Sequence, residues 1–242
     1  MVTKDSFTAL LVYIDDIVVA SNSIACIESL KNFLNTSFKI KDLDPLRYFL
    51  SIEVARSTKG IHLCQRKYTL AILSNSGTLG SKPAKLPMDQ NLKLHKDSGT
   101  PLQDCSSFRR LIGRLLYLTI TRLNINQDLL LSANSPLNLY GYCDSDWASC
   151  PDTRKSTIGF CLFIGQSLVS WKSKKQSVVS RSSTKAEYRA MAATCCEFTW
   201  IRQIFHNLSI PQPNLAILHY DNQAALHIDA KPVFHERTKH IK

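Results

Sequence analysis

The 242-residue sequence has no long apolar run, no low-complexity tract and no repeat of fixed period. Its longest apolar stretch near the start, residues 9–14, is much shorter than the roughly 20 residues that a membrane-spanning helix needs. It also lacks the layout of a secretory signal peptide. We therefore expect a globular protein of the cytoplasm or the nucleus that makes no contact with a membrane.

The sequence contains 8 cysteines but no Cys-x-x-Cys pair. Several of these cysteines, such as Cys143 and Cys161, lie within apolar strand patterns. This distribution predicts reduced, buried cysteines, and it indicates neither a disulfide framework nor a zinc site.

Acidic residues are few compared with basic ones. There are 19 Asp and Glu against 30 Lys and Arg, which gives a net charge of +11. A basic surface favours a polyanionic partner, because neutralising phosphate groups releases counterions. The length allows two domains that each bury a core of their own. The composition therefore makes nucleic acid the first partner class to consider.

The residues Tyr13, Ile14, Asp15 and Asp16 stand between two short apolar runs. Two β-prone runs around a polar break predict a hairpin with both carboxylates at its tip. Adjacent carboxylates repel each other, so a bound cation would explain their pairing. A solvated Asp-Asp turn is the simpler alternative.

Hydrophobic periodicity predicts the other elements. In the first half we expect helices over residues 24–38, 68–73 and 108–118, strands over 48–54 and 61–64, and a loop over 80–101. A junction at residues 124–128 separates the two halves. In the second half we expect strands over 137–143, 159–164, 168–171 and 215–220 and helices over 184–208 and 222–228. This order predicts a mixed sheet with a helix packed across it.

A second group of carboxylates stands at the ends of these predicted elements. Asp144 and Asp146 follow the first strand of the second half, Glu187 lies near the start of the long helix, and Asp221 follows the last strand. Asp144 and Asp146 are two residues apart, so they would share a face of a continuing strand. Convergent carboxylates can bind divalent ions and activate water for attack on a phosphodiester.

Each carboxylate also has a structural alternative. Glu187 lies three residues after Thr184, which is the spacing of a capping box. Asp221 could cap the helix that follows it, and Asp144 or Asp146 could hold a turn with Ser145.

These features together resemble the Pol polyprotein of Ty1/copia-type long-terminal-repeat retrotransposons, of the plant type. The hairpin resembles the Tyr-x-Asp-Asp hairpin of reverse transcriptases. The order of Asp144, Glu187 and Asp221 resembles ribonuclease H. Further similar stretches are residues 42–50, 110–118, 143–148, 180–188 and 235–241.

The resemblance implies a fold and an activity. The expected fold is α+β or α/β: a partial reverse-transcriptase palm and thumb over residues 1–125, then a ribonuclease H-like mixed sheet with packed helices over 126–242. The implied reactions are RNA-directed DNA synthesis and cleavage of RNA in RNA–DNA hybrids, with Mg²⁺ or Mn²⁺ as cofactor. By resemblance, the metal ligands and catalytic residues are Asp15, Asp16, Asp144, Glu187 and Asp221.

The resemblance also leads us to expect incomplete sites. Compared with the family, the sequence begins just before the metal-binding hairpin, omits a few dozen residues after Ile125, and stops before the last strand and helix of the ribonuclease H. We therefore expect impaired activity, with other Pol segments as possible partners. The alternative is a non-catalytic nucleic-acid-binding remnant, or a poorly folded pseudogene product.

A basic segment follows the third predicted strand of the second half. Trp171, Lys172, Lys174, Lys175 and Arg181 could form an edge that contacts the backbone of an RNA–DNA hybrid. A solvated charged face with one packed tryptophan explains the same residues.

Overall fold

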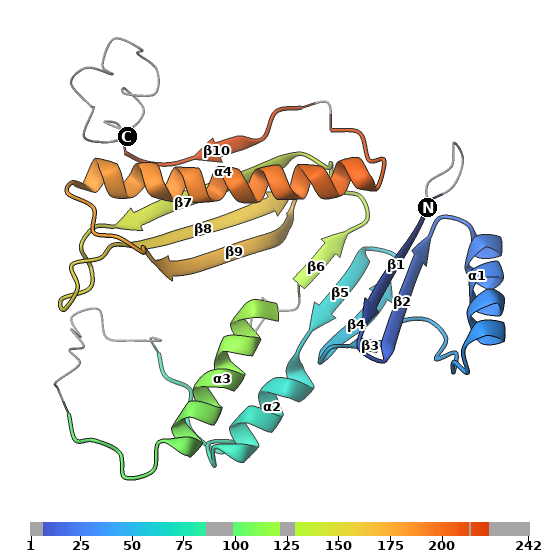
Figure 1. Cartoon of the computed structure of the whole chain (residues 1–242), viewed down its shortest axis with the longest axis horizontal. Helices are drawn as coiled ribbons and strands as arrows, with labels where there is room; N and C mark the ends of the chain where they lie inside the picture. Colours follow the sequence, from blue (N-terminus) through green and yellow to red (C-terminus); the bar gives the residue numbers. More distant parts are fainter. Residues whose placement is uncertain (1–6, 86–98, 122–128, 213, 223–242) are drawn as a thin grey trace.

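The computed structural model describes residues 7–85, 99–121, 129–212 and 214–222 (Figure 1). In chain order, the elements of the first half are β1 (Thr8–Tyr13), β2 (Asp16–Ser21), α1 (Ile24–Ser37), β3 (Tyr48–Phe49), β4 (Ile52–Ser57), β5 (Gly60–Cys64), α2 (Arg66–Asn75) and α3 (Ser106–Thr121). Those of the second half are β6 (Leu129–Ser132), β7 (Leu139–Asp146), β8 (Thr157–Ile164), β9 (Ser167–Lys175), α4 (Ser183–Asn207) and β10 (Ile217–His219).

The first two strands form a separate two-stranded antiparallel sheet. Apolar side chains along it are largely exposed, including Leu11 at 55% and Val12 at 57%. Helix α1 follows and contacts β2, but it buries none of its residues. Its N-cap is Ser23, whose hydroxyl accepts a hydrogen bond from the Cys26 amide. Within the described residues, this region therefore has local structure but no core.

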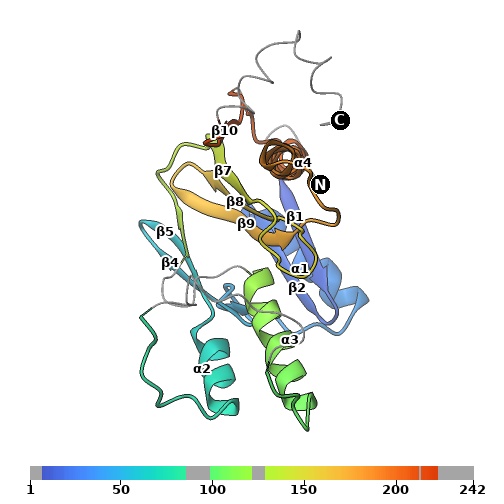
Figure 2. The same cartoon turned by 90° about the vertical axis from the view of Figure 1, so that its left-hand side faces the viewer.

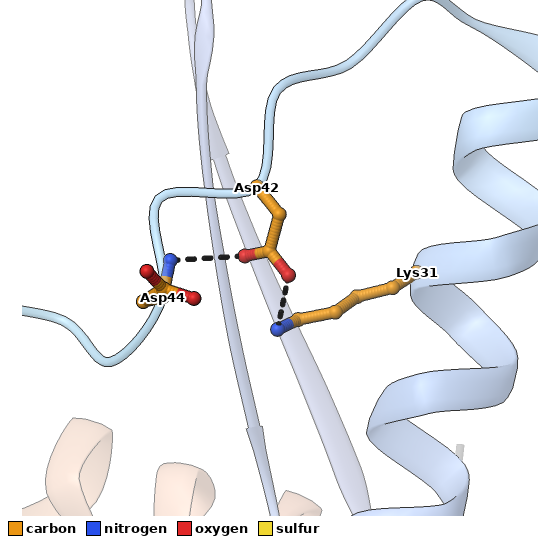
Figure 3. A network of polar contacts seen from close by, with 3 residues as sticks. All are labelled: Lys31, Asp42 and Asp44. Carbon is orange, nitrogen blue, oxygen red and sulfur yellow. Dashed lines mark hydrogen bonds and ion pairs between the residues drawn. The ribbon is translucent and has the colours of Figure 1, made fainter.

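One ion pair ties α1 to the loop that follows it (Figure 3). Lys31 Nζ lies 2.7 Å from Asp42 Oδ2, and the other carboxylate oxygen accepts the Asp44 amide at 3.1 Å. The hydrogen bond from Lys31 lowers the pKa of Asp42, and the same bond raises the pKa of Lys31. Because both side chains are well exposed, the pair fixes the loop's position more than it stabilises the fold.

The second sheet has the order β3-β4-β5-β6, with all neighbours antiparallel. Its last strand comes from beyond the predicted junction and pairs Gly60 with Ser132. Gly60 has a φ of +143°, and a Cβ there would lie 2.0 Å from the Leu131 carbonyl oxygen. Only glycine fits this approach without displacement. The position of β6 therefore depends on Gly60.

Helices α2 and α3 lie side by side below this sheet (Figure 2). The rings of Tyr68 and Tyr117 meet edge to face with centroids 5.3 Å apart. The Tyr117 hydroxyl donates to the Leu50 carbonyl at 2.8 Å, and burial raises the pKa of that tyrosine. These contacts join α3 to α2 and to the turn between β3 and β4.

The third sheet has the order β10-β7-β8-β9, in which β10 runs parallel to β7 and the other neighbours are antiparallel. Helix α4 lies across one face of this sheet (Figures 1 and 2) and contacts β7 and β8. Its inner face packs on the sheet through a single hydrophobic cluster, which consists of Leu139, Cys143, Phe160, Leu162, Phe198, Ile201 and Phe205. This cluster forms the main core of the described residues.

The structure confirms the coarse fold prediction and shifts several boundaries. The elements are mixed helices and mainly antiparallel sheets, as an α+β class requires. The predicted strand over 137–143 in fact spans Leu139–Asp146, because its pairing with β8 continues through both aspartates. The predicted helix over 222–228 and most of the predicted loop over 80–101 lie outside the described residues. None of the described helices is long and apolar enough to span a bilayer.

Candidate functional site

The first pair of carboxylates lies at the tip of the β1–β2 hairpin. Strand pairing of Tyr13 with Asp16 leaves Ile14 and Asp15 as the two turn residues. The turn is therefore one residue earlier than the sequence predicted, and Asp16 is the first residue of β2. Ile14 has a φ of 51°, which is uncommon for a β-branched residue. Asp15 and Asp16 are both exposed, as a hairpin tip requires.

The second group is built on β7. Residues of this strand alternate between the two faces: Cys143 and Ser145 are buried under α4, whereas Asp144 and Asp146 are exposed. This alternation confirms that the two aspartates share a face. Across the strand pair, Asp144 is opposite Gly159, where an added Cβ would meet no described residue within 4 Å.

Glu187 approaches this group from α4. Its side chain is only 5% exposed, and its Oε2 atom has no hydrogen-bond partner among the residues that the structure describes. The pKa of Glu187 is raised to about 7, first by burial, then by the charge of Asp144, and to a lesser degree by that of Asp221. A backbone hydrogen bond at Ser145 acts in the opposite direction. A buried carboxylate with a free oxygen beside two like charges is costly to ionise.

Asp221 reaches the same region through β10. The parallel pairing of β10 with β7 ends at His219 and Tyr142. Asp144 lies two residues further along β7, and Asp221 lies two residues after the end of β10. Asp221 is exposed. Two segments, the end of β7 and the residues after β10, thus bring carboxylates within electrostatic reach of Glu187.

The capping-box alternative for Glu187 is wrong. Helix α4 has Ser182 as its N-cap, and the Ser182 hydroxyl accepts the Lys185 amide at 3.2 Å. Glu187 therefore lies beyond the third helical position that a capping box needs. The alternative for Asp221 concerns a helix that lies outside the described residues.

The carboxylates of the second group do not form a complete metal centre in this structure. Within the part of the chain that the structure describes, no three His, Cys, Asp or Glu side chains lie close enough to hold one ion. This statement applies to Asp15 and Asp16 as well as to the second group. The donor chemistry nevertheless suits Mg²⁺ or Mn²⁺, which prefer carboxylate oxygens.

The predicted basic edge is divided between two faces of the sheet. Directly paired residues share a face, so Trp171, opposite Cys161, lies on the same face as Asp144. Lys175, opposite Thr157, lies there too. Lys172 and Lys174 are opposite Phe160 and Ile158, which face α4. Arg181 is exposed in the loop before α4. These residues therefore do not form one continuous surface.

Sequence reasoning missed a buried polar network beneath the second group. Gln176 donates through Nε2 to the Ala186 carbonyl at 2.9 Å, and its Oε1 accepts the Ser180 hydroxyl at 2.8 Å. Arg189 in turn donates to Ser180 at 2.9 Å, and the Trp147 indole donates to the Ser180 carbonyl at 2.9 Å. The network fixes the start of α4, and with it Glu187, against the end of β7. Polar residues in a loop gave no signal for it.

An aromatic cluster was also missed. On the face of the sheet that carries Asp144, the rings of Tyr140 and Phe163 stack with centroids 5.1 Å apart, and those of Tyr142 and His219 stack at 5.0 Å. Alternation along β7 predicts a shared face for Tyr140 and Tyr142, but the partners from β8 and β10 depend on register.

This chain is similar to a reverse-transcriptase family model and to retrotransposon Pol polyproteins. Residues 4–90 match the model of the family described as reverse transcriptase (RNA-dependent DNA polymerase). The chain is 35% identical over 269 residues to the "Retrovirus-related Pol polyprotein from transposon RE2" of Arabidopsis thaliana, with 98% of the chain covered. It is 28% identical over 280 residues to the "Retrovirus-related Pol polyprotein from transposon TNT 1-94" of Nicotiana tabacum, with 99% of the chain covered.

A third relative is similar over nearly its whole length. The "Uncharacterized mitochondrial protein AtMg00810" of Arabidopsis thaliana is 40% identical over 225 residues, which cover 79% of this chain and 93% of that protein. No solved structure matches this chain.

The alignments also carry information on length. The chain spans 18% of the RE2 polyprotein and 21% of the TNT 1-94 polyprotein. The RE2 alignment of 269 residues is longer than the 242-residue chain, so some residues of RE2 have no counterpart here. Such a gap agrees with the predicted internal deletion.

Proposed function

Since the chain belongs to the reverse-transcriptase family of Ty1/copia-type retrotransposon Pol polyproteins, we propose that it combines a reverse-transcriptase region with a ribonuclease H-like domain. The second domain would bind Mg²⁺ or Mn²⁺ and an RNA–DNA hybrid. Its hybrid cleavage would be weak.

The topology of the second half supports the ribonuclease H part of this proposal. Three antiparallel strands are followed by a long helix and then by a fourth strand, which lies parallel to the first. The sheet thus places the first and fourth strands side by side, with Asp144 at the end of one and Asp221 just after the other. This is the arrangement that the resemblance implies for the ribonuclease H carboxylates.

The buried carboxylate of Glu187 is the observation that carries the proposal. A protein that needed Glu187 only for packing would gain by replacing it with a neutral residue, because ionisation is opposed by burial and by Asp144. A divalent cation held by Glu187, whose Oε2 is unpartnered among the described residues, and by the neighbouring aspartates would remove this cost. The donor set therefore fits a hard cation.

The residues have distinct roles in this proposal. Asp144, Glu187 and Asp221 would hold the cation, which when bound supplies charge stabilisation for phosphodiester hydrolysis. The Gln176 network keeps Glu187 in place, since it ties the first turns of α4 to the β9–α4 loop. Gly159 has no side chain to cover Asp144, so a strand of nucleic acid would approach Asp144 from this side. Trp171 and Lys175, on the same face, would contact that strand.

A non-catalytic nucleic-acid-binding role is the second candidate. It is favoured by the lack, among the described residues, of three ligand side chains that already lie within one coordination sphere. The net charge of +11 would support binding without any chemistry.

A metal titration distinguishes the two candidates. We expect Mg²⁺ or Mn²⁺ to raise the melting temperature of the wild-type chain, because the ion binds the folded state. The increase should be lost in the Asp144→Asn, Asp221→Asn double variant. An Asp152→Asn variant changes a loop aspartate and serves as the control. Equal stabilisation in the wild type and the double variant would mean that these residues form no metal site.

Nucleic-acid binding is tested separately. Fluorescence anisotropy with a labelled RNA–DNA hybrid should show binding at low salt that weakens steeply as salt is added. Cleavage of the same hybrid, followed on a gel, should be weak or absent in the wild type. A folded sample that fails to bind at low salt would exclude both candidates.

In the first half, Asp15 and Asp16 remain the proposed metal ligands of a polymerase site. We expect no primer extension by this chain with Mg²⁺, because phosphoryl transfer depends on precise positioning and the hairpin tip is exposed on a two-stranded sheet. Extension that disappears in an Asp15→Asn variant would contradict this expectation.

A further inference from the structure

Cys150 lies in the loop between β7 and β8, outside the carboxylate group. Lys175, the last residue of β9, points its ammonium at this cysteine with a distance of 3.0 Å between Nζ and Sγ. The two residues come from different elements, and the loop is held in place by its own hydrogen bonds. Cys150 donates its amide to the Lys155 carbonyl at 3.1 Å, and Arg154 donates to the Cys150 carbonyl at 2.8 Å.

We propose that Cys150 and Lys175 form a reactive thiolate–ammonium pair, and that Cys150 is a site of covalent modification by hydroperoxides and disulfides. This inference is independent of the proposed metal site. Cys150 is half-buried, and the exposed part of the residue is where a small reagent would approach.

The surroundings of the sulfur favour the thiolate. The pKa of Cys150 is lowered to about 6, first by the hydrogen bond from Lys175 and then by donors from Thr153 and the Asp152 backbone. Lys175 is the charged group that approaches from β9, and Asp152, Arg154 and Lys155 are those of the loop itself. An ordinary cysteine has a pKa of about 8.5 and is mostly protonated at neutral pH.

Other cysteines of the chain have different surroundings. Burial raises the pKa of Cys143 to about 11, and it also raises the pKa of Cys161. The sulfur of Cys150, by contrast, lies 3.0 Å from the ammonium of Lys175. A reagent that selects thiolates should therefore select Cys150 at mildly acidic pH.

The Cys150 thiolate supplies both electrons for the reaction with a hydroperoxide, so no further reductant is needed. The thiolate sulfur attacks the outer peroxide oxygen, an S–O bond forms and the O–O bond breaks. Sulfur loses two electrons and becomes a sulfenic acid, while the peroxide is reduced to an alcohol or water. The leaving oxygen takes a proton from the Lys175 ammonium, which water then reprotonates.

The rate of Cys150 relative to that of an ordinary thiol depends on pH, and this dependence identifies the Cys150–Lys175 pair. A thiol with a pKa near 6 is about half ionised at pH 6, whereas an ordinary thiol is about 0.3% ionised. The lower pKa also reduces intrinsic nucleophilicity, with a Brønsted coefficient of about 0.45. Together these factors make Cys150 about tenfold faster than an ordinary thiol at pH 6 and about tenfold slower at pH 9.

The experiment measures the rate at which a pyridyl disulfide modifies Cys150 in the full chain, by peptide mass spectrometry between pH 5 and pH 9. Exposed Cys105 shows that the reagent reaches surface thiols, and glutathione serves as an ordinary thiol. We expect the rate at Cys150 to exceed that of glutathione at pH 6 and to fall below it at pH 9. A midpoint of the Cys150 profile above pH 8 would overturn the proposal.

A variant pair tests the role of Lys175. In Lys175→Gln the midpoint at Cys150 should rise by one pH unit or more, whereas Lys174→Gln should leave it unchanged, because Lys174 lies on the opposite face of β9. Equal profiles in the two variants would overturn the pair. If Lys175→Gln does not fold, the pH profile of the modification rate at Cys150 in the wild type still tests the proposal. With hydrogen peroxide, a dimedone adduct should form at Cys150 and be absent in Cys150→Ser.

Discussion

The two halves of this chain differ in how much apolar surface they bury. In the second half, β7, β8 and α4 bury a continuous apolar cluster in which Leu162 is fully buried. In the first half, the described residues include two buried hydrophobic side chains, Ile72 and Leu118, and the β1–β2 sheet exposes both of its faces. Strand pairing and helix caps can therefore specify local structure without a core, but such structure depends on other surfaces for stability.

The comparison is tested most strongly by the same substitution in each half. Leu162→Ala removes a fully buried side chain and should lower the free energy of unfolding by about 3–5 kcal/mol. Leu11→Ala, at a residue that is 55% exposed, should change it by less than about 0.5 kcal/mol. Urea denaturation monitored by circular dichroism measures both. Similar losses would mean that the first half has a core of its own.

Glu187→Gln should raise the free energy of unfolding when EDTA removes the metal, and lower it when Mg²⁺ is present. In the folded chain Glu187 keeps its proton up to about pH 7, against 4.5 for an unperturbed carboxyl, so the free energy of unfolding falls as the pH rises between these values. In EDTA at pH 8 the variant should therefore be more stable, by up to about 3 kcal/mol. With Mg²⁺ it should lose the metal-dependent gain. Thermal melts at pH 4 and pH 8 check the sign, since the EDTA difference should vanish at pH 4.

Gly60→Ala tests the link between the halves. The new Cβ would lie 2.0 Å from the Leu131 oxygen at a φ that alanine rarely adopts, and we expect a loss of about 1–3 kcal/mol. Gly80→Ala meets nothing within 4 Å and should be neutral. The measurement is the urea midpoint of each variant. A neutral Gly60→Ala would show that β6 does not pack on β5 as described.

Lys31→Ala should have the smallest effect. It removes the ion pair with Asp42 on the exposed surface of α1, and added salt would screen that pair in any case. We expect the melting temperatures of wild type and variant to agree within error at physiological salt. A clear decrease would show that the loop over residues 42–44 contributes to stability.

Much of the fold follows from the sequence, because periodicity is a local property. Two apolar runs around a polar break predicted the β1–β2 hairpin, and helical spacing predicted α4, which buries Phe198, Ile201 and Phe205. The shared face of Asp144 and Asp146 followed from the two-residue period of a strand.

What the sequence did not reveal depends on register and on long-range contacts. The division of Trp171 and Lys172 between two faces follows from their partners on β8, which no local pattern specifies. The burial of Glu187 depends on how α4 lies across β7, and the pairing of Cys150 with Lys175 joins a loop to a distant strand end. The domain boundary at residue 125 stays a prediction.

Strand β6 has a consequence for the order of folding. It pairs with β5 although helices α2 and α3 lie between them in the chain, and the Ser132 amide also donates to the Ser167 hydroxyl of β9 at 3.1 Å. During synthesis, β5 therefore leaves the ribosome long before the strand that completes its sheet. Contacts between residues so far apart slow folding, because the intervening loop must close first. The β3-β4-β5-β6 sheet can finish folding only when the start of the second half has emerged, so the first half completes its fold only after part of the second half has been synthesised.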